Sequence, residues 1–228
     1  MKTGIFIISA PSGSGKTTLV GRLLQELDGL HFSVSYTTRP PRGQEQNGKE
    51  YFFVTREEFQ KMIQQQGLLE WAEVFGNYYG TARRFLDEAL EGGKDLLLDI
   101  DVQGAVQVKK KIQEAVSIVI LPPSRKELEW RLRHRSQDSE EVIRKRLQDA
   151  AQEIQGYHQY DYILINDQLE RSAEQLQAIV LAERWRLQKE PQAQPEPKAL
   201  ESVRALAESC LKERVQTRVQ PILATFGG

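Results

Sequence analysis

Short apolar runs alternate with longer amphipathic stretches as far as about residue 187. The run 95–100 is almost wholly apolar, as expected of a strand that is covered on both faces. By the same criteria we predict strands at 4–10, 116–121 and 162–165, and helices at 15–27, about 102–111, from Ser124 and at 171–187. Strands that alternate with helices predict an α/β fold with a parallel sheet flanked by helices.

Two stretches interrupt this alternation. Residues from about 33 to 84 are rich in Tyr, Phe, Gly, Arg and Thr and contain short strand-like pieces, so we interpret them as an inserted subdomain of mixed strands. Residues of about 131–146 carry many arginines around Ser136-Gln137-Asp138-Ser139, a sequence typical of a mobile connection between helices. The expected domain is therefore 1–187, with a core of 1–32 and 85–187.

The composition changes near residue 188. Prolines lie among Gln, Glu and Lys at 188–198, which is typical of a linker. The extension beyond it, 199–228, is expected to be helical, because apolar residues recur at helical spacing at Leu200, Val203, Leu206, Cys210 and Leu211. It could pack on the core, pair with another chain or be mobile, and its role stays open. We expect a chain that ends near Lys189 to keep most of its activity.

Charge and cysteine content narrow the classes of partner. The formal net charge is -1, so no overall basic field points to nucleic acid or to a membrane surface. No apolar run is long enough to span a bilayer. Cys210 is the only cysteine, which excludes an intrachain disulfide and favours a reducing, cytoplasmic location. The oligomeric state is left open.

A candidate phosphate-binding loop lies between the first predicted strand and the first predicted helix, where a P-loop must lie. Its glycines would let backbone N–H groups approach phosphate oxygens, Lys16 would place a charge on the β- and γ-phosphates, and the Thr17 hydroxyl could ligate Mg²⁺. The strict pattern begins with Gly, so Ala10 requires a negative φ. The alternative is a Gly/Ser-rich turn before an ordinary helix. The loop residues are Ala10, Pro11, Ser12, Gly13, Ser14, Gly15, Lys16 and Thr17.

Further segments indicate which reaction the loop serves. They are Ser33-Val34-Ser35-Tyr36-Thr37-Thr38-Arg39-Pro40-Pro41-Arg42, Gly48-Lys49-Glu50-Tyr51, Glu70-Trp71-Ala72, Gly76-Asn77-Tyr78-Tyr79-Gly80-Thr81 and Asp99-Ile100-Asp101-Val102-Gln103-Gly104. This ordered set resembles the guanylate kinases over roughly residues 3–187, and bacterial members of that family also have Ala at the first loop position. The resemblance implies a P-loop kinase core, an inserted GMP-binding subdomain and a helical lid. The implied activity is transfer of the γ-phosphate of ATP to GMP or dGMP, which recycles GMP and supplies guanine nucleotides.

The residue types in these segments suit GMP. A monophosphate needs several donors, which forked guanidinium groups and hydroxyls supply. Guanine presents N1–H and N2–H₂ as donors, so the carboxylates of Glu70 and Asp101 match it, while Thr81 can donate to O6. The expected GMP-binding residues are Ser35, Arg39, Arg42, Tyr51, Glu70, Tyr79, Thr81 and Asp101.

The resemblance also implies groups that act on ATP. Lid arginines would stabilise the charge that spreads over the transferring phosphoryl group. Asp99 ends an apolar strand, where ligands bind in open α/β sheets, and either holds the Mg²⁺ shell or orients an arginine. Asn166 resembles the family's adenine contact, whereas Arg133 and Arg144 fit an exposed helical face of mixed charge. The expected catalytic residues are Lys16, Arg131, Arg135, Arg146 and Asp99.

Two other interpretations stay open. A guanylate kinase-like binding module would use the GMP site to hold a phosphopeptide, but it would be expected to have a damaged phosphate loop, and Lys16 and Thr17 are intact. A related P-loop kinase for another small phosphate acceptor should lack the pair Glu70 and Asp101. A panel of acceptors separates these interpretations.

The loop generates the first prediction. Lys16→Ala lowers kcat by several orders of magnitude but leaves GMP binding nearly intact, because the expected GMP contacts lie in other segments. Steady-state kinetics on the purified variant, together with a GMP titration, measure both effects. Near-normal turnover would exclude a kinase that uses this loop.

Overall fold

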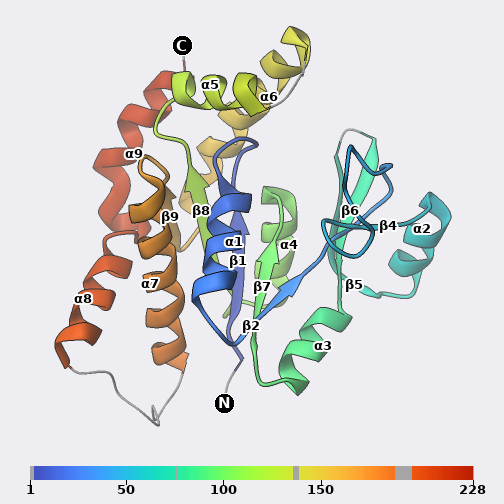
Figure 1. Cartoon of the computed structure of the whole chain (residues 1–228), viewed down its shortest axis with the longest axis horizontal. Helices are drawn as coiled ribbons and strands as arrows, with labels where there is room; N and C mark the ends of the chain where they lie inside the picture. The colour runs from blue at the N-terminus through green and yellow to red at the C-terminus, as the bar shows by residue number, and fades with distance from the viewer. Residues whose placement is uncertain (1–2, 75, 136–138, 188–196, 228) are drawn as a thin grey trace. The chain divides into compact units, whose positions relative to one another are not determined.

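The computed structural model describes residues 3–74, 76–135, 139–187 and 197–227 (Figure 1). The chain forms two compact units. The first unit comprises Met1–Ile8 and Gly29–Ala115, and the second comprises Ser9–Asp28 and Val116–Gly228. Among the described residues, no helix has both the length and the apolar character needed to span a bilayer.

The predicted parallel sheet is present. Its strands are β1 (Ile5–Ser9), β2 (Leu30–Ser33), β7 (Asp95–Asp99), β8 (Val116–Leu121) and β9 (Tyr162–Ile165). They follow the order β2-β7-β1-β8-β9. In the first unit, β7 pairs in parallel with both β1 and β2, and its residues Leu96, Leu97 and Leu98 are fully buried. This burial explains the continuous apolar run, because a strand covered on both faces has no solvent side.

The insertion forms a second, mixed sheet within the first unit. Its strands are β3 (Tyr36–Thr37), β4 (Phe52–Phe53), β5 (Leu68–Val74) and β6 (Asn77–Ala82), in the order β4-β3-β6-β5. β3 pairs with β4 in parallel, and the other pairs are antiparallel. Helix α2 (Arg56–Gln64) begins at a capping box formed by Thr55 and Glu58. All four strands lie inside the predicted insertion.

Two more helices complete the first unit. Helix α3 (Arg84–Glu91) packs against β2 and β7, and helix α4 (Val102–Lys111) packs against β5. The side chain of Gln107 fastens α4 to β5 by bonding both the N–H and the C=O of Trp71. Lys111 Nζ donates to Leu69 O at 2.6 Å. Side chains of α4 are therefore hydrogen-bonded to the backbone of β5 inside one unit.

The second unit contains β8 and β9, which pair in parallel, and the helices around them. These are α1 (Lys16–Glu26), α5 (Arg125–Arg135), α6 (Glu140–Gln155), the short 3₁₀ helix η1 (Gly156–Gln159), α7 (Leu169–Leu187), α8 (Pro197–Glu208) and α9 (Lys212–Phe226). The lid helices α5 and α6 extend beyond the predicted 131–146. Of the predicted mobile connection, 136–138 lie outside the described residues.

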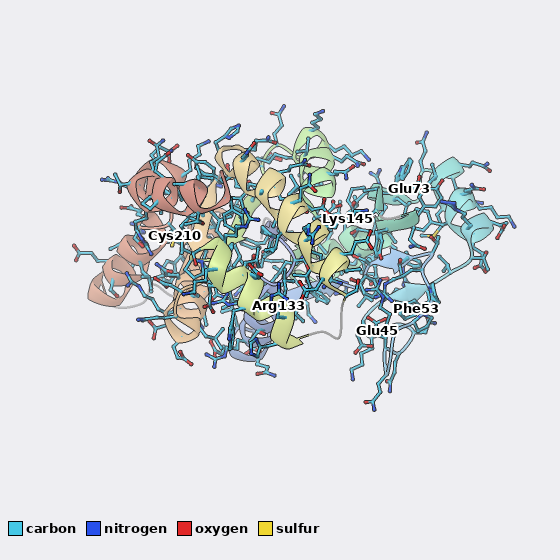
Figure 2. All side chains as sticks on the ribbon, turned by 90° about the horizontal axis from the view of Figure 1, so that it is seen from above. Glu45, Phe53, Glu73, Arg133, Lys145 and Cys210 are labelled. Atoms are coloured by element: carbon cyan, nitrogen blue, oxygen red, sulfur yellow. The ribbon has the colours of Figure 1, made fainter. Side chains whose placement is uncertain are left out.

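The C-terminal extension forms part of the second unit. Helix α8 packs against α7, and α9 packs against α5, α6 and β9 (Figure 1). Between the two helices, the chain pairs with β9, because Ile163 N–H donates to Cys210 O at 2.7 Å. Figure 2 shows Cys210 among these elements, where it is buried. Of the three placements that the sequence left open, the structure therefore shows packing against the core. Most of the predicted linker, 188–196, lies outside the described residues.

Candidate functional site

The predicted phosphate-binding loop joins β1 to α1. It closes on itself through a hydrogen bond of 3.1 Å from Ser14 N–H to Pro11 O. Gly13 and Gly15 have φ angles of 89° and 94°. These angles lie in the left-handed region that glycine adopts without steric penalty. The loop conformation therefore requires glycine at both positions.

The end of the loop opens helix α1. The N-cap residue is Gly15, which has no side chain to cap the helix. The first turn contains no acidic residue. The positive end of α1 is thus arranged to bind an anion beside Lys16. Among the described residues other than glycine, only Gln66 has a positive φ. Ala10 therefore has the negative φ that an alanine at the first loop position requires. Thr17 lies exposed at the start of α1.

Side chains of neighbouring elements lie so close to Gly13 and Gly15 that a larger residue would not fit at either position without a shift. A Cβ atom on Gly13 would lie 3.0 Å from side-chain carbons of Leu128 and Leu132, both on α5. A Cβ atom on Gly15 would collide with the side-chain amide nitrogen of Asn166. The loop is therefore packed between the lid helix α5 and the segment that follows β9.

Asn166 is bound to the loop backbone. Its Nδ2 donates to Ser14 O at 2.8 Å, and the residue is 5% exposed. Its own carbonyl accepts a hydrogen bond of 3.0 Å from Arg131 Nη2. The structure thus shows that Asn166 holds the loop against α5, a role that the resemblance did not assign. An adenine contact of this residue stays a prediction.

Two buried polar atoms at the half-site formed by the phosphate-binding loop, α5 and Asn166 have no hydrogen-bond partner among the described residues. Arg131 Nε is paired with Glu127 at 3.0 Å, but Arg131 Nη1 is buried with no hydrogen-bond partner among the described residues. The same is true of Ser14 Oγ. Buried donors normally have partners, and a guanidinium N–H is a strong donor to phosphate oxygens. This half-site is rich in donors and suits an anion.

The other arginines of α5 and α6 lie in different surroundings. Arg146 is half-buried on α6, and the side chain of Arg135 lies outside the described residues. Arg133 Nη2 donates to Glu129 at 2.7 Å and to Glu140 at 2.9 Å, so it links α5 to α6 (Figure 2). This exposed ion-pair network agrees with the interpretation of Arg133 as part of a mixed-charge face.

Two acidic residues meet in the first unit. Glu70 lies in β5 and is 3% exposed. Asp101 caps helix α4 by accepting a hydrogen bond of 2.7 Å from Gly104 N–H. A Cβ atom on Gly104 would lie 2.5 Å from Glu70 Oε2 and 3.3 Å from Asp101 Oδ1. The predicted pair of carboxylates is thus brought together over Gly104, whose missing side chain leaves room for Glu70.

The environment of Glu70 disfavours its charge. The pKa of Glu70 is raised to about 7, mainly by burial and also by the charge of Asp101, while Thr81 and Lys111 oppose the rise. The Thr81 hydroxyl is buried and has no well-aligned hydrogen-bond partner among the described residues, although it lies near the Glu70 carboxyl. Asp101 already accepts from Gly104 N–H, and Glu70 is buried beside Thr81, so a ligand edge with N–H groups would suit the acceptor positions that the two carboxyls have left.

A buried arginine lies elsewhere on the mixed sheet. Arg39 is 7% exposed and forms a forked pair with Glu45, with bonds of 2.7 Å and 2.8 Å. Its guanidinium also lies over the Tyr51 ring, 4.9 Å from the centroid, and the Tyr51 and Tyr79 rings meet edge to face at 6.0 Å. Three of the predicted GMP-binding residues are therefore in one cluster.

Glu45 is a residue that the sequence reasoning missed. Besides pairing with Arg39, it accepts a hydrogen bond of 2.8 Å from Arg42 N–H. The Arg39 hydrogen bond holds the pKa of Glu45 below its usual range. The sequence signal was a single acid in a turn that contains two predicted phosphate-binding arginines. Glu45 fixes Arg39 and the turn that carries Arg42.

Three further predicted residues, Ser35, Arg42 and Asp99, lie elsewhere in the first unit. Ser35 is half-buried between β2 and β3, and the Arg42 side chain is exposed. Asp99 is half-buried at the end of β7, in register with Ile8 of β1. Its two alternative roles both stay predictions. No group of three or more His, Cys, Asp or Glu side chains in the described part of the chain could hold a metal ion.

The chain is similar to known guanylate kinases over most of its length. The guanylate kinase family model matches residues 2–183. A guanylate kinase of Escherichia coli K12 is 50% identical over 190 residues, which are 82% of this chain and 92% of that protein. The crystal structure of a guanylate kinase from Anaplasma phagocytophilum has a TM-score of 0.67 and 36% identity, and the match covers 82% of this chain and 88% of that one.

One relative extends the similarity through the C-terminal helices. A guanylate kinase of Koribacter versatilis is 55% identical over an alignment of 229 positions, which covers 99% of this chain and 97% of that protein. A guanylate kinase of Shewanella violacea is 53% identical over 181 residues, which are 79% of this chain and 87% of that protein. The extension is therefore shared by some relatives and lies beyond the match with others.

The raised pKa of Glu70 generates a prediction about stability. The folded protein holds the Glu70 proton to about pH 7, whereas the ordinary value is 4.5. Because the folded state binds more protons than the unfolded state in this window, the free energy of unfolding falls as pH rises through it. The full effect is about 3 kcal/mol. The glutamine of Glu70→Gln does not titrate, so the variant should lack this decrease in the free energy of unfolding.

Denaturant unfolding at pH 5 and pH 8 measures the effect. The stability of Glu70→Gln relative to wild type should increase from pH 5 to pH 8. Glu91→Gln, at an exposed position of α3, is the matched control and should show no such change. If the difference between Glu70→Gln and wild type is the same at both pH values, the Glu70 carboxyl is not held protonated by its surroundings.

Proposed function

Because the chain belongs to the guanylate kinase family, we propose that it transfers the γ-phosphate of ATP to GMP, giving ADP and GDP. dGMP is the second acceptor. The observation that supports this proposal most strongly is the buried pair of Glu70 and Asp101 over Gly104. The proposed role is to recycle GMP and supply guanine nucleotides, with ATP and GMP as the partners.

Guanine recognition follows from the hydrogen-bonding groups of the first unit. Guanine N1–H and N2–H₂ would donate to Glu70 and Asp101, and the Thr81 hydroxyl would donate to O6. Adenine presents an acceptor at N1 and would leave the Glu70 carboxyl facing it unpaired. An unpaired buried polar group costs about 1–3 kcal/mol, and more if it is charged. In its ionised form, the desolvated Glu70 carboxylate would be stabilised by a base that supplies N–H donors, as guanine does, and not by a base that presents an acceptor.

The GMP phosphate would be bound by the basic cluster of the same unit. Arg39, Arg42, Tyr51, Tyr79 and Ser35 are its proposed ligands. The second pKa of a phosphate monoester is about 6, so the group is mostly a dianion at neutral pH and is itself the nucleophile. No general base is required. The protein's contribution is to position this group and to neutralise charge.

The ATP phosphates would be bound by the second unit. The loop N–H groups, Lys16 and the buried Arg131 Nη1 supply donors to them. In the proposed closed state, Arg135 and Arg146 reach the transferring phosphoryl group, where added positive charge lowers the barrier. Asp99 either supports the metal shell or orients an arginine.

Mg²⁺ is the proposed cofactor, bound together with ATP. Mg²⁺ is usually held by one or two protein oxygens, by substrate phosphates and by water. Thr17 is exposed at the start of α1, and its hydroxyl is the proposed protein ligand. When bound, the ion neutralises charge on the β- and γ-phosphates.

The selectivity for guanine is the decisive test. Wild-type protein should phosphorylate GMP and dGMP but hardly AMP, CMP or ribose bisphosphates, since sites built to bond a substrate group discriminate by roughly 10⁴-fold or more. In Glu70→Gln, a donor NH₂ replaces one acceptor oxygen. Its kcat/KM should fall much more for GMP than for AMP, while the KM for ATP hardly changes. An ADP-release assay on each acceptor measures these values.

The outcomes separate the candidate functions. Absence of ADP release with every acceptor would favour a binding module, and another preferred acceptor would favour a related kinase. A GMP-to-AMP ratio that is unchanged in Glu70→Gln would leave Glu70 a structural residue and assign base recognition to Asp101 and Thr81.

Glu45 provides a test of the proposed binding of the GMP phosphate. Glu45→Gln keeps the size of the side chain but removes the charge that fixes Arg39, so the KM for GMP should rise about tenfold, as expected when a charge-assisted pair is lost. The KM for ATP should stay within about twofold, because Glu45 lies with the GMP-binding residues. Glu57→Gln, at an exposed position of α2, is the control. A lower KM for GMP would show that Glu45 competes with the phosphate for Arg39.

A further inference from the structure

The C-terminal helix α9 has an apolar face that is buried in the second unit. Val215, Val219, Ile222 and Phe226 recur at helical spacing and are 1%, 0%, 5% and 8% exposed. The elements that α9 packs against are α5, α6 and β9 (Figure 1). Two of these elements are the lid helices, so α9 covers the part of the unit that the proposed mechanism uses.

The end of α9 fixes the start of α5. The Thr225 hydroxyl accepts a hydrogen bond of 3.0 Å from Arg125 N–H, the first residue of α5, and donates to Ile222 O at 2.7 Å. Ser124 Oγ accepts from Glu127 N–H at 3.1 Å. The first turn of a helix leaves several N–H groups without partners, and here α9 satisfies one that the helix itself cannot.

Helix α5 in turn forms one wall of the phosphate-binding loop. Leu128 and Leu132 lie against Gly13, and Arg131 lies between them in sequence with one buried N–H left for a ligand. A shift of α5 along its axis or about its first turn would move all three side chains together. The contacts at Arg125 therefore act on the groups that would face ATP.

A second contact of α9 involves the segment that follows β9. Arg218 of α9 lies 3.8 Å from Asp167, the residue after Asn166. Asn166 holds the loop through Ser14 O. The ion pair is exposed and contributes little by itself. It does show that α9 spans from the segment after β9 to the start of α5.

We propose that α9 positions the lid helix α5 against the phosphate-binding loop, with Thr225 and Phe226 as positioning residues for ATP. This inference rests on the proposed function. It also replaces the expectation that a chain ending near Lys189 would keep most of its activity. The argument for coupling is that one helix, α5, carries the contact with α9 at its first residue and the residues that lie against the loop in its middle.

Full-length variants test the proposal better than truncation, because truncation would expose the buried faces of α5, α6 and β9 at once. Thr225→Val keeps the shape of the side chain but cannot accept from Arg125 N–H. Phe226→Ala removes buried contact at the end of α9. The control is Gln216→Ala, at an exposed position of the same helix. Circular dichroism at the assay temperature establishes that each variant is folded.

Calorimetric titration with Mg·ATP and, separately, with GMP gives affinities that do not depend on turnover. Thr225→Val should weaken ATP binding about threefold to tenfold, the range expected for loss of a helix cap, and Phe226→Ala should weaken it more. GMP affinity should stay within about twofold, because its proposed ligands lie in the first unit. Amide hydrogen exchange in α5 should be faster in Thr225→Val and unchanged in Gln216→Ala.

Two results would overturn the proposal. One is wild-type affinity for ATP in both variants while their unfolding temperatures fall, which would make α9 only a stabilising element. The other is an equal loss of affinity for ATP and GMP. If wild-type protein fails to phosphorylate GMP but both variants bind ATP more weakly, the proposed function fails and the positioning role is upheld.

Discussion

The hydrogen bond from the Asn166 side chain to Ser14 O is the interaction on which the second unit depends. It fixes the phosphate-binding loop from the side opposite to α5 and is possible only because Gly15 has no side chain. Through its backbone carbonyl, Asn166 also holds Arg131. The phosphate-binding loop, α5 and the segment after β9 are thereby joined at one buried residue. The backbone N–H groups that would meet phosphate are therefore held in place without a ligand.

The two units present opposite kinds of hydrogen-bonding group. The second unit offers donors, namely the loop N–H groups, the end of α1 and the buried N–H of Arg131. The part of the first unit around Glu70 and Asp101 offers carboxyl oxygens, and burial raises the pKa of Glu70. The packing of α4 against β5 holds Glu70 and Asp101 in place within the first unit. Keeping the Glu70 carboxyl ionised in the folded protein costs stability, a cost that the proposed recognition of guanine would explain.

The sequence predicted most of the fold, because the parallel strands are buried on both faces and the phosphate loop is a local motif. It did not predict contacts that depend on distant segments. The closeness of Glu70 to Gly104 depends on α4 packing against β5, and the Arg39–Glu45 pair depends on the conformation of a turn. The buried face of α9 was visible as helical spacing, but spacing does not tell which surface a helix covers. The partner of Asn166 is likewise set by tertiary packing.

The chain between α8 and α9 also determines how the molecule behaves toward other molecules. β9 ends the order of the parallel sheet, and an edge strand presents unpaired N–H and C=O groups that can template pairing with another chain. Here Ile163 N–H is bonded to Cys210 O, and Asp161 O accepts from Lys212 N–H at 3.3 Å. These bonds cap part of the edge with the protein's own backbone. A homologue without this segment must protect the same edge from aggregation by other means, such as charged side chains, a bulge or a shorter strand.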